Sequence, residues 1–178
     1  MTNPRRPLVA FLFALPVLLI TAACGSSNST PTNPSTNPST VSSCSGGTAR
    51  GSMSAQINGT GWAAVCISSA SVANNIFSIG ATDNNTNATN AQIIAMATPA
   101  APGTYQIGPP PGITNGANGL LTIGAQLWAA NPIQGNGAIT ITTVTATGAS
   151  GTFAFNLVAE PPATGTKTIT NGVFNVTF

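Results

Sequence analysis

From residue 51 onward, apolar and polar residues alternate, and Gly, Asn or Pro interrupts the pattern about every ten residues. Such alternation is typical of strands with one buried face, and no window has the period of a long amphipathic helix. The pattern predicts strands over 51–57, 61–68, 75–82, 91–98, 103–107, 119–128, 137–145, 150–159 and 166–177. We therefore expect an all-β domain, an antiparallel β-sandwich or an open, flattened barrel of about eight to nine strands.

The first two strands can be aligned from the turn that joins them. Asn58-Gly59 is a typical two-residue hairpin turn and predicts that Ala55 lies opposite Trp62. In this register Cys66 lies opposite Gly51. One set of side chains then shares the core face: Met53, Ala55, Ile57, Trp62, Ala64 and Cys66.

The last strand is predicted to contain a β-bulge. Phe174 is five positions after Ile169, an odd step, so a regular strand would place the two side chains on opposite faces. An extra residue near Asn171-Gly172 keeps both side chains on the core face, together with Val176.

Residues 1–23 have the layout of a secretory signal peptide. Arg5 and Arg6 precede an unbroken apolar stretch over 8–20, and small residues then lead to Cys24. This end resembles a bacterial lipoprotein signal, which is cleaved before a lipid-modified cysteine, although Thr21 stands where Leu is commonest. We expect Cys24 to carry the lipid anchor. In such lipoproteins Gly25, rather than Asp, implies passage to the outer membrane.

Two other interpretations of this end remain open. Residues 7–24 are nearly long enough for an uncleaved membrane helix, but Pro16 lies within them and the following tract lacks charged and aromatic residues. The Arg5-Arg6 pair also belongs to twin-arginine export signals, although Pro7 follows it directly and the rest of that signal is missing.

Residues 24–50 are predicted to tether the domain to its anchor. Residues 25–43 read GSSNSTPTNPSTNPSTVSS, with a Pro-Ser-Thr-Asn repeat and Val41 as the single aliphatic residue. This composition cannot bury apolar area and favours a disordered spacer. The alternative is that the tract is itself recognised or O-glycosylated.

Charge excludes several classes of function. The chain has four Lys or Arg residues, two Asp or Glu residues and no His. Removal of residues 1–23 leaves Arg50, Lys167, Asp83 and Glu160, so the mature chain is formally neutral. Proteins that bind nucleic acid carry a basic surface, which this chain lacks, so we expect no nucleic-acid partner.

Cys44 and Cys66 are expected to form a disulfide. They are the two thiols that remain after Cys24 receives its lipid, and exported proteins are commonly oxidised. Free buried thiols and a metal pair are the alternatives, and a metal pair lacks supporting His or further Cys residues.

No catalytic arrangement is expected. Without His, a Ser-His-Asp or Cys-His arrangement is impossible. Asp83 and Glu160 are the only side-chain carboxylates for a glycosidase-like pair, and both fit solvated turns better. Residues 83–94 begin with the ligand spacing of a calcium loop, but Ala88 replaces its Gly and Ile94 its bidentate Glu. We predict a non-enzyme without metal or cofactor.

The aromatic residues offer one candidate ligand site. Trp62 and Tyr105 are expected to pack in the domain. Trp128, with Gln126 and Asn131 nearby, has the composition of a surface platform for a sugar. The alternative is that Trp128 belongs to the core.

The edges of the predicted sheet also need a partner or a cover. Few charges are available to protect them, and the apolar segment 91–97 would aggregate if exposed. The edges are therefore closed, covered or paired with another chain, and residues 109–111 are a candidate cover.

The domain resembles a family of bacterial lipoprotein β-domains of unknown function. The resemblance covers residues 51–178 and rests on turn and core motifs: Ile57-Asn58-Gly59-Thr60 with Trp62, Gly103-Thr104-Tyr105, Ser150-Gly151-Thr152-Phe153-Ala154-Phe155, and Ile169-Thr170-Asn171-Gly172-Val173-Phe174. It implies the fold and export, but no catalytic or binding residues.

Together these features predict a lipid-anchored protein of the bacterial cell envelope. Its β-domain would present a surface for binding a glycan or a protein. The alternative is a structural envelope component that self-associates or packs through its sheet edges.

Overall fold

A computed structural model of the chain describes residues 40–44, 48–83, 91–109 and 116–178. All regular structure in these ranges is β-strand: β1 (Val41–Ser42), β2 (Arg50–Ile57), β3 (Thr60–Ala63), β4 (Cys66–Ala73), β5 (Ile76–Thr82), β6 (Ala91–Ala97), β7 (Gly103–Ile107), β8 (Ala117–Ile123), β9 (Gln126–Ala130), β10 (Asn136–Thr145), β11 (Gly148–Glu160) and β12 (Thr166–Thr177). All strand pairs are antiparallel, which confirms the predicted fold class.

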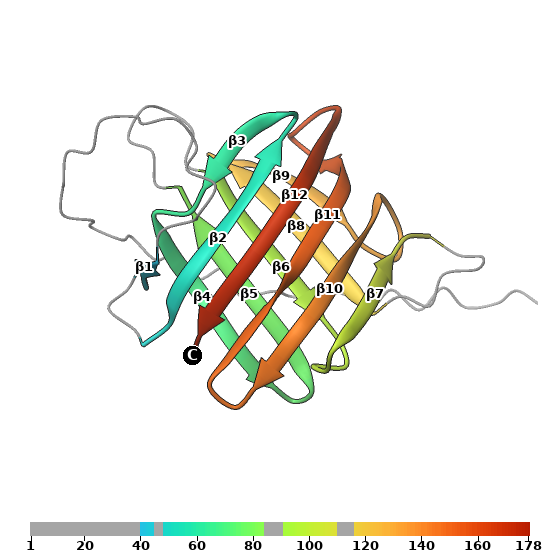
Figure 1. Ribbon diagram of the computed structural model, residues 1–178. Helices are drawn as coiled ribbons and strands as arrows, with labels where there is room; N and C mark the ends of the chain where they lie inside the picture. The colour runs from blue at the N-terminus through green and yellow to red at the C-terminus, as the bar shows by residue number, and fades with distance from the viewer. Residues whose placement is uncertain (1–39, 45–47, 84–90, 110–115) are drawn as a thin grey trace, which may run out of the picture.

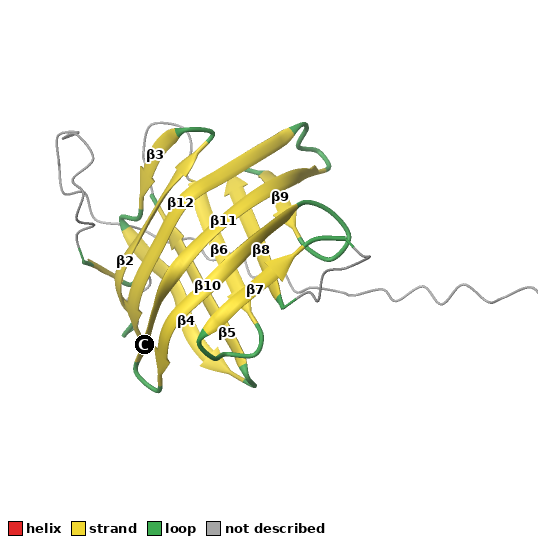
Figure 2. Ribbon diagram, turned by 45° about the vertical axis from the view of Figure 1, so that its right-hand side comes forward, coloured by secondary structure: helices red, strands yellow, loops and turns green. Residues whose placement is uncertain are grey.

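The strands form two layers whose directions cross steeply (Figure 1). The front layer has the order β3-β2-β12-β11-β10-β7, and the back layer has the order β4-β5-β6-β8-β9. Figure 2 shows β7 at the edge of the front layer. In the described ranges no helix is long and apolar enough to cross a membrane.

β11 joins the two layers. Its first part pairs with β10, whereas Val158–Glu160 at its end pairs with β9. Such strands make the corners of steeply crossed sandwiches. The described strand path has two ends, one at β1 and the other at β4, so the sheet stays open and flattened.

The core fills the space between the layers. Phe77 of β5 stacks on Phe174 of β12 with ring centroids 5.2 Å apart, so aromatic packing crosses the sandwich. The largest fully buried side chains are Phe77, Phe155, Phe174, Met53, Ile67, Ile79, Ile93, Ile107, Leu121, Ile139, Ile141 and Leu157.

The first hairpin has the predicted register, with Ala55 opposite Trp62. Asn58 and Gly59 have φ values of 49° and 79°, as a type I′ turn requires. The predicted position of Cys66 opposite Gly51 is wrong, because the chain changes layers first. The Ala64 amide still donates to β2, but the next amide donates to Thr82 at the end of β5, and Cys66 pairs with Thr82.

The predicted bulge in β12 is confirmed. Gly172 is three positions after Ile169, whereas their partners on β11, Phe153 and Phe155, are only two positions apart. The pairing of β12 with β2 shifts at the same place. The bulge keeps Ile169, Phe174 and Val176 buried on the core face.

The described part of the chain has 12 strands, more than predicted, for three reasons. The predicted strand 61–68 is divided between β3 and β4 where the chain changes layers. The predicted strand 119–128 is a hairpin, β8–β9, with a turn at Gly124 (φ 59°). β1 is additional.

Segment 91–97, which would aggregate at an exposed edge, is the inner strand β6 between β5 and β8. Of the proposed cover at 109–111, Pro109 is exposed, and the rest lies outside the described residues.

Candidate functional site

The outer face of the front layer is covered by short, uncharged side chains. One row runs in register across five strands from Thr104 of β7 to Thr140, Thr152, Val173 and Ser54. Neighbouring positions in such a row are about 4.8 Å apart. The row therefore places hydroxyl groups and one aliphatic side chain side by side on a continuous surface.

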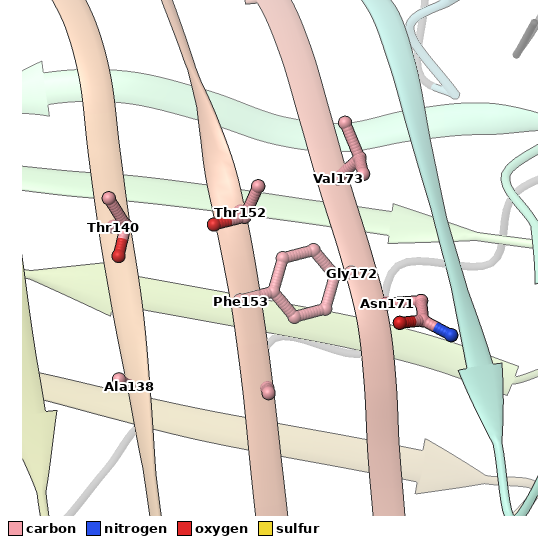
Figure 3. A pocket seen from close by; sticks show the side chains of 8 residues that line it. Ala138, Thr140, Thr152, Phe153, Asn171, Gly172 and Val173 are labelled. Carbon is pink, nitrogen blue, oxygen red and sulfur yellow. The ribbon is translucent and has the colours of Figure 1, made fainter.

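An open depression of about 460 Å³ lies on this face over β10, β11 and β12. Figure 3 shows Thr140 and Thr152 on one side of it and Val173 and Asn171 on the other. Its lining residues are Ala138, Thr140, Thr152, Phe153, Ala154, Asn171, Gly172 and Val173.

The depression forms where short side chains meet the β12 bulge. Ala138 and Ala154 face each other across β10 and β11 and fill little space above the sheet. Gly172 lies opposite Phe153, and a Cβ at Gly172 would lie 2.6 Å from carbons of the Phe153 ring. The ring thus occupies the space that a side chain at Gly172 would need, and the bulge turns Asn171 (φ 53°) outward.

Three polar groups around the depression can hydrogen-bond a ligand. The Thr140 hydroxyl pairs with that of Thr104 at 2.9 Å, and a hydroxyl can make further bonds. Asn171 Nδ2 donates to Gln56 Oε1 at 3.1 Å, which leaves its own amide oxygen as an acceptor. The Thr152 hydroxyl is exposed and has no protein partner within the described part of the chain.

The described charged side chains all lie outside this depression. Lys167 Nζ lies 5.0 Å from the centroid of the Trp128 ring, and Glu160 accepts a hydrogen bond from Gln134 Nε2. Asp83 Oδ1 accepts from the Ala91 amide at 2.9 Å. The depression therefore offers hydroxyl, amide and aliphatic groups but no formal charge.

The two carboxylates considered for a glycosidase-like pair are held apart. Thr82, next to Asp83, and Glu160 stand at the ends of one row that crosses β5, β6, β8, β9 and β11. Four strand spacings amount to roughly 19 Å, whereas glycosidase pairs lie roughly 5–10 Å apart.

Trp128 is not the surface platform that one sequence interpretation predicted. It is only 3% exposed, and its Nε1 donates to the Thr164 carbonyl at 3.3 Å. The turn at Gly124 sets this orientation, because it pairs Trp128 with the buried Leu121, and both point inward. Trp128 is a core residue, the alternative left open above.

Gln126 and Asn131 do not form a site with Trp128. Gln126 is exposed at the start of β9. Asn131 shapes its own loop, because its Oδ1 accepts from the amides of Ile133 and Gln134 at 2.8 and 3.0 Å. Its side-chain oxygen therefore caps a turn within its own loop.

Cys44 and Cys66 form a disulfide in the structure. It joins the segment before β2 to the start of β4, beside a parallel bridge between Ser43 and Ile67. Cys24, the signal peptide and residues 24–39 and 45–47 of the predicted tether lie outside the described residues, as do residues 84–90 of the calcium-loop pattern. Within the described ranges no group of three His, Cys, Asp or Glu side chains could hold a metal ion.

A family model described as "Domain of unknown function (DUF6252)" matches residues 49–176. The chain belongs to the DUF6252 family. The match runs from just before β2 to Val176 in β12, so the DUF6252 domain includes the depression and Cys66, while Cys44 precedes it. Neither the comparison with curated proteins nor that with solved structures found a match.

The sequence analysis missed the residues around the depression because they are small and chemically ordinary. A usable signal was present: the strand that carries Phe153 and Phe155 inward carries Thr152 and Ala154 outward. The predicted bulge marked where this outer surface is interrupted. The pairing with β10, which supplies Thr140 and Ala138, required the strand order.

Proposed function

We propose that this protein is a lipid-anchored, exported envelope protein whose DUF6252 domain binds an uncharged glycan without catalysis. The observation that carries the proposal is the depression on the outer face of β10, β11 and β12. It combines an aliphatic surface with hydroxyl and amide groups and has no charged side chain in its lining.

A sugar ring matches this combination. One ring has an aliphatic C–H surface, which can pack on Ala138, Ala154 and Val173, and hydroxyls that can bond Thr152 and Asn171. The volume of about 460 Å³ lies within the range of small-molecule sites. A charged sugar would lose water without gaining an ion pair, so neutral sugars are favoured.

The same surface is poorly suited to a protein partner. Binding energy in protein interfaces concentrates in buried aromatic and Arg side chains. The depression exposes no such anchor, because Phe153 is only 3% exposed and packs into the core. Of the two ligand classes expected from the sequence, the geometry favours the glycan.

The binding test uses the purified full chain in detergent and a panel of immobilised neutral and acidic oligosaccharides. We expect the protein to be retained by at least one neutral glycan. We expect no retention that depends on the acidic groups of a glycan. Calorimetry on the retained glycan then compares Thr152→Val with Thr166→Val. Thr166 is an exposed threonine near the start of β12, outside the depression.

Thr152→Val removes one hydroxyl while keeping the shape, and one lost hydrogen bond corresponds to about a fivefold to tenfold weaker affinity. Thr166→Val should bind like the unmodified protein. The proposal fails if no neutral glycan binds at about 1 mM, an affinity of about −4 kcal/mol. Equal affinity of the Thr152→Val variant and the unmodified protein would place the site elsewhere.

The anchor is tested separately, by growing the native host with an alkyne fatty acid. We expect label on the unmodified chain and none on Cys24→Ala. Protease treatment of intact and lysed cells then locates the domain. Loss from intact cells indicates an outward-facing domain, and loss only after lysis indicates a domain inside the envelope. An unlabelled but membrane-bound chain would instead support the uncleaved helix.

A further inference from the structure

The described edges of the two layers are protected to very different degrees. β3 has only four residues, and β7 has five residues with Pro102 and Pro109 close to its ends. β4 has eight residues, with neither a charge nor a proline. Short length, charge and proline are the usual protections of an edge, so β4 is the least protected of the described edges.

The β4–β5 turn determines which backbone groups of β4 point toward β5 and which point away from it. Asn74 and Asn75 have φ values of 51° and 62°, and Ala73 pairs with Ile76, which defines a two-residue hairpin. In such a hairpin the residues that flank the turn are hydrogen-bonded to each other, and the pattern alternates along the strand. The N–H and C=O groups of Ala70 and Val72 therefore point away from β5.

These outward groups are not paired within the described part of the chain. Ser43 forms a bridge at Ile67, and the Cys44 amide donates to the Ile67 carbonyl at 2.8 Å. The bridge is parallel, so Val41 lies toward the beginning of β4, away from Val72. In the described ranges no segment pairs with β4 beyond Ile67 on this side.

Apolar side chains on the core face of β4 are also partly exposed at this edge. Val72 pairs with Phe77, and Ala70 pairs with Ile79, so both lie on the face of β4 that continues the core. Phe77 and Ile79 are fully buried, yet Val72 is 40% exposed because, within the described ranges, no segment pairs with this part of β4 on its outer side. One more strand on this edge would cover Val72 and satisfy the outward backbone groups together.

We propose that a second copy of this chain supplies that strand, through antiparallel pairing of β4 with β4. Ala70 of one copy lies opposite Val72 of the other, and the two-fold axis passes between their Ser71 residues. Each hydrogen-bonded pair exchanges two N–H···O bonds, and the interface is the same patch on both copies. A second copy can supply the strand because β4 carries no charge, so two β4 strands do not repel each other. The two Ser71 side chains that meet at the axis are small and polar.

The pairing joins the two back layers into one sheet. It leaves the depression free, since that lies on the outer face of the front layer. The inference therefore does not depend on the glycan proposal.

The test is photo-crosslinking in the native host, with p-benzoylphenylalanine at Ser71 of the full chain. Ser71 is exposed and lies at the two-fold axis, so irradiation should give an adduct of twice the chain's mass, identified by mass spectrometry. The matched control carries p-benzoylphenylalanine at Gln106, on the exposed edge strand β7. This control should not form the adduct of twice the chain's mass.

Two variants then test the backbone and the side chains separately. Ala70→Pro removes an outward N–H without removing a bond to β5, and Val72→Lys places like charges near each other across the axis. Each should reduce the adduct about tenfold or more while the melting temperature stays within a few degrees. If Ala70→Pro fails to fold, Val72→Lys decides.

The proposal is overturned if Ser71 gives no self-adduct in cells that contain the folded protein. It is also overturned if the adduct contains a different protein, or if it persists undiminished in a folded Val72→Lys variant.

Discussion

The two faces of β11 differ although they alternate residue by residue. Phe153, Phe155 and Leu157 point into the core and are at most 3% exposed. Thr152 and Ala154, which flank Phe153 in sequence, are exposed on the outer face. The inner residues are large and interlocked, and the outer ones are small and open to solvent. Stability and ligand binding should therefore respond separately to substitutions one position apart.

The largest effect on stability is expected from Phe155→Ala. The Phe155 ring lies 5.5 Å from that of Phe153 and against Gly119, where an added Cβ would lie 2.8 Å from ring carbons. Loss of a buried phenyl ring typically lowers the free energy of unfolding by about 3–5 kcal/mol. Urea titration followed by tryptophan fluorescence measures the change, and Ala154→Ser should change it by less than about 0.5 kcal/mol. Equal losses would mean that the two faces do not differ as described.

Removal of the disulfide should have the next largest effect, without acting on either face of β11. Cys44 and Cys66 are 22 positions apart, and closing a loop of that length is expected to stabilise the fold by about 3 kcal/mol through the unfolded chain. Cys44→Ser with Cys66→Ser should lower the free energy of unfolding by this amount while the folded variant keeps its glycan affinity. Reduction of the unmodified protein is the control, and an unchanged midpoint in urea would contradict the expectation.

Gly172→Ala tests the boundary between the two faces. Its Cβ would lie 2.5 Å from the Phe153 carbonyl oxygen and 2.6 Å from its ring, and the backbone oxygen cannot move aside easily. Overpacking of this kind lowers the free energy of unfolding by about 1–3 kcal/mol. Gly61→Ala is the matched control, because nothing lies within 4 Å of its added Cβ. A stable Gly172→Ala variant would show that Phe153 can repack.

The smallest effect on stability is expected from Val173→Thr on the outer face. The two side chains have nearly the same shape, and Val173 is already 43% exposed, so the free energy of unfolding should change by less than about 0.5 kcal/mol. Glycan affinity should fall about twofold to fivefold, because an aliphatic contact of the sugar is replaced by a hydroxyl. Calorimetry compares it with Val65→Thr, a similar exposed valine outside the depression.

Local rules were sufficient for several parts of this fold. The Asn58-Gly59 turn determines its own hairpin register, and the odd spacing from Ile169 to Phe174 requires a bulge. The hairpin register depends on residues close to the turn, and the bulge depends on which side chains of one strand must share a face. These features were therefore predictable from the sequence.

Other parts depend on partners that are distant in sequence. The change of layers between Ala64 and Val65 depends on Thr82 as the new partner, and no local signal marks it. The orientation of Trp128 depends on a turn at Gly124-Ala125, which an apolar stretch conceals. The depression needs three adjacent strands in register, so its residues could be identified only from the assembled sheet.

The disulfide also determines how a mechanical pull from the N-terminal side enters the domain. Tension on the chain before Cys44 passes through the covalent bond directly to Cys66 at the start of β4. The chain between the two cysteines contains β2 and β3 and is bypassed. A pull on the chain before Cys44 therefore cannot peel these two strands from the front layer while the bond is intact.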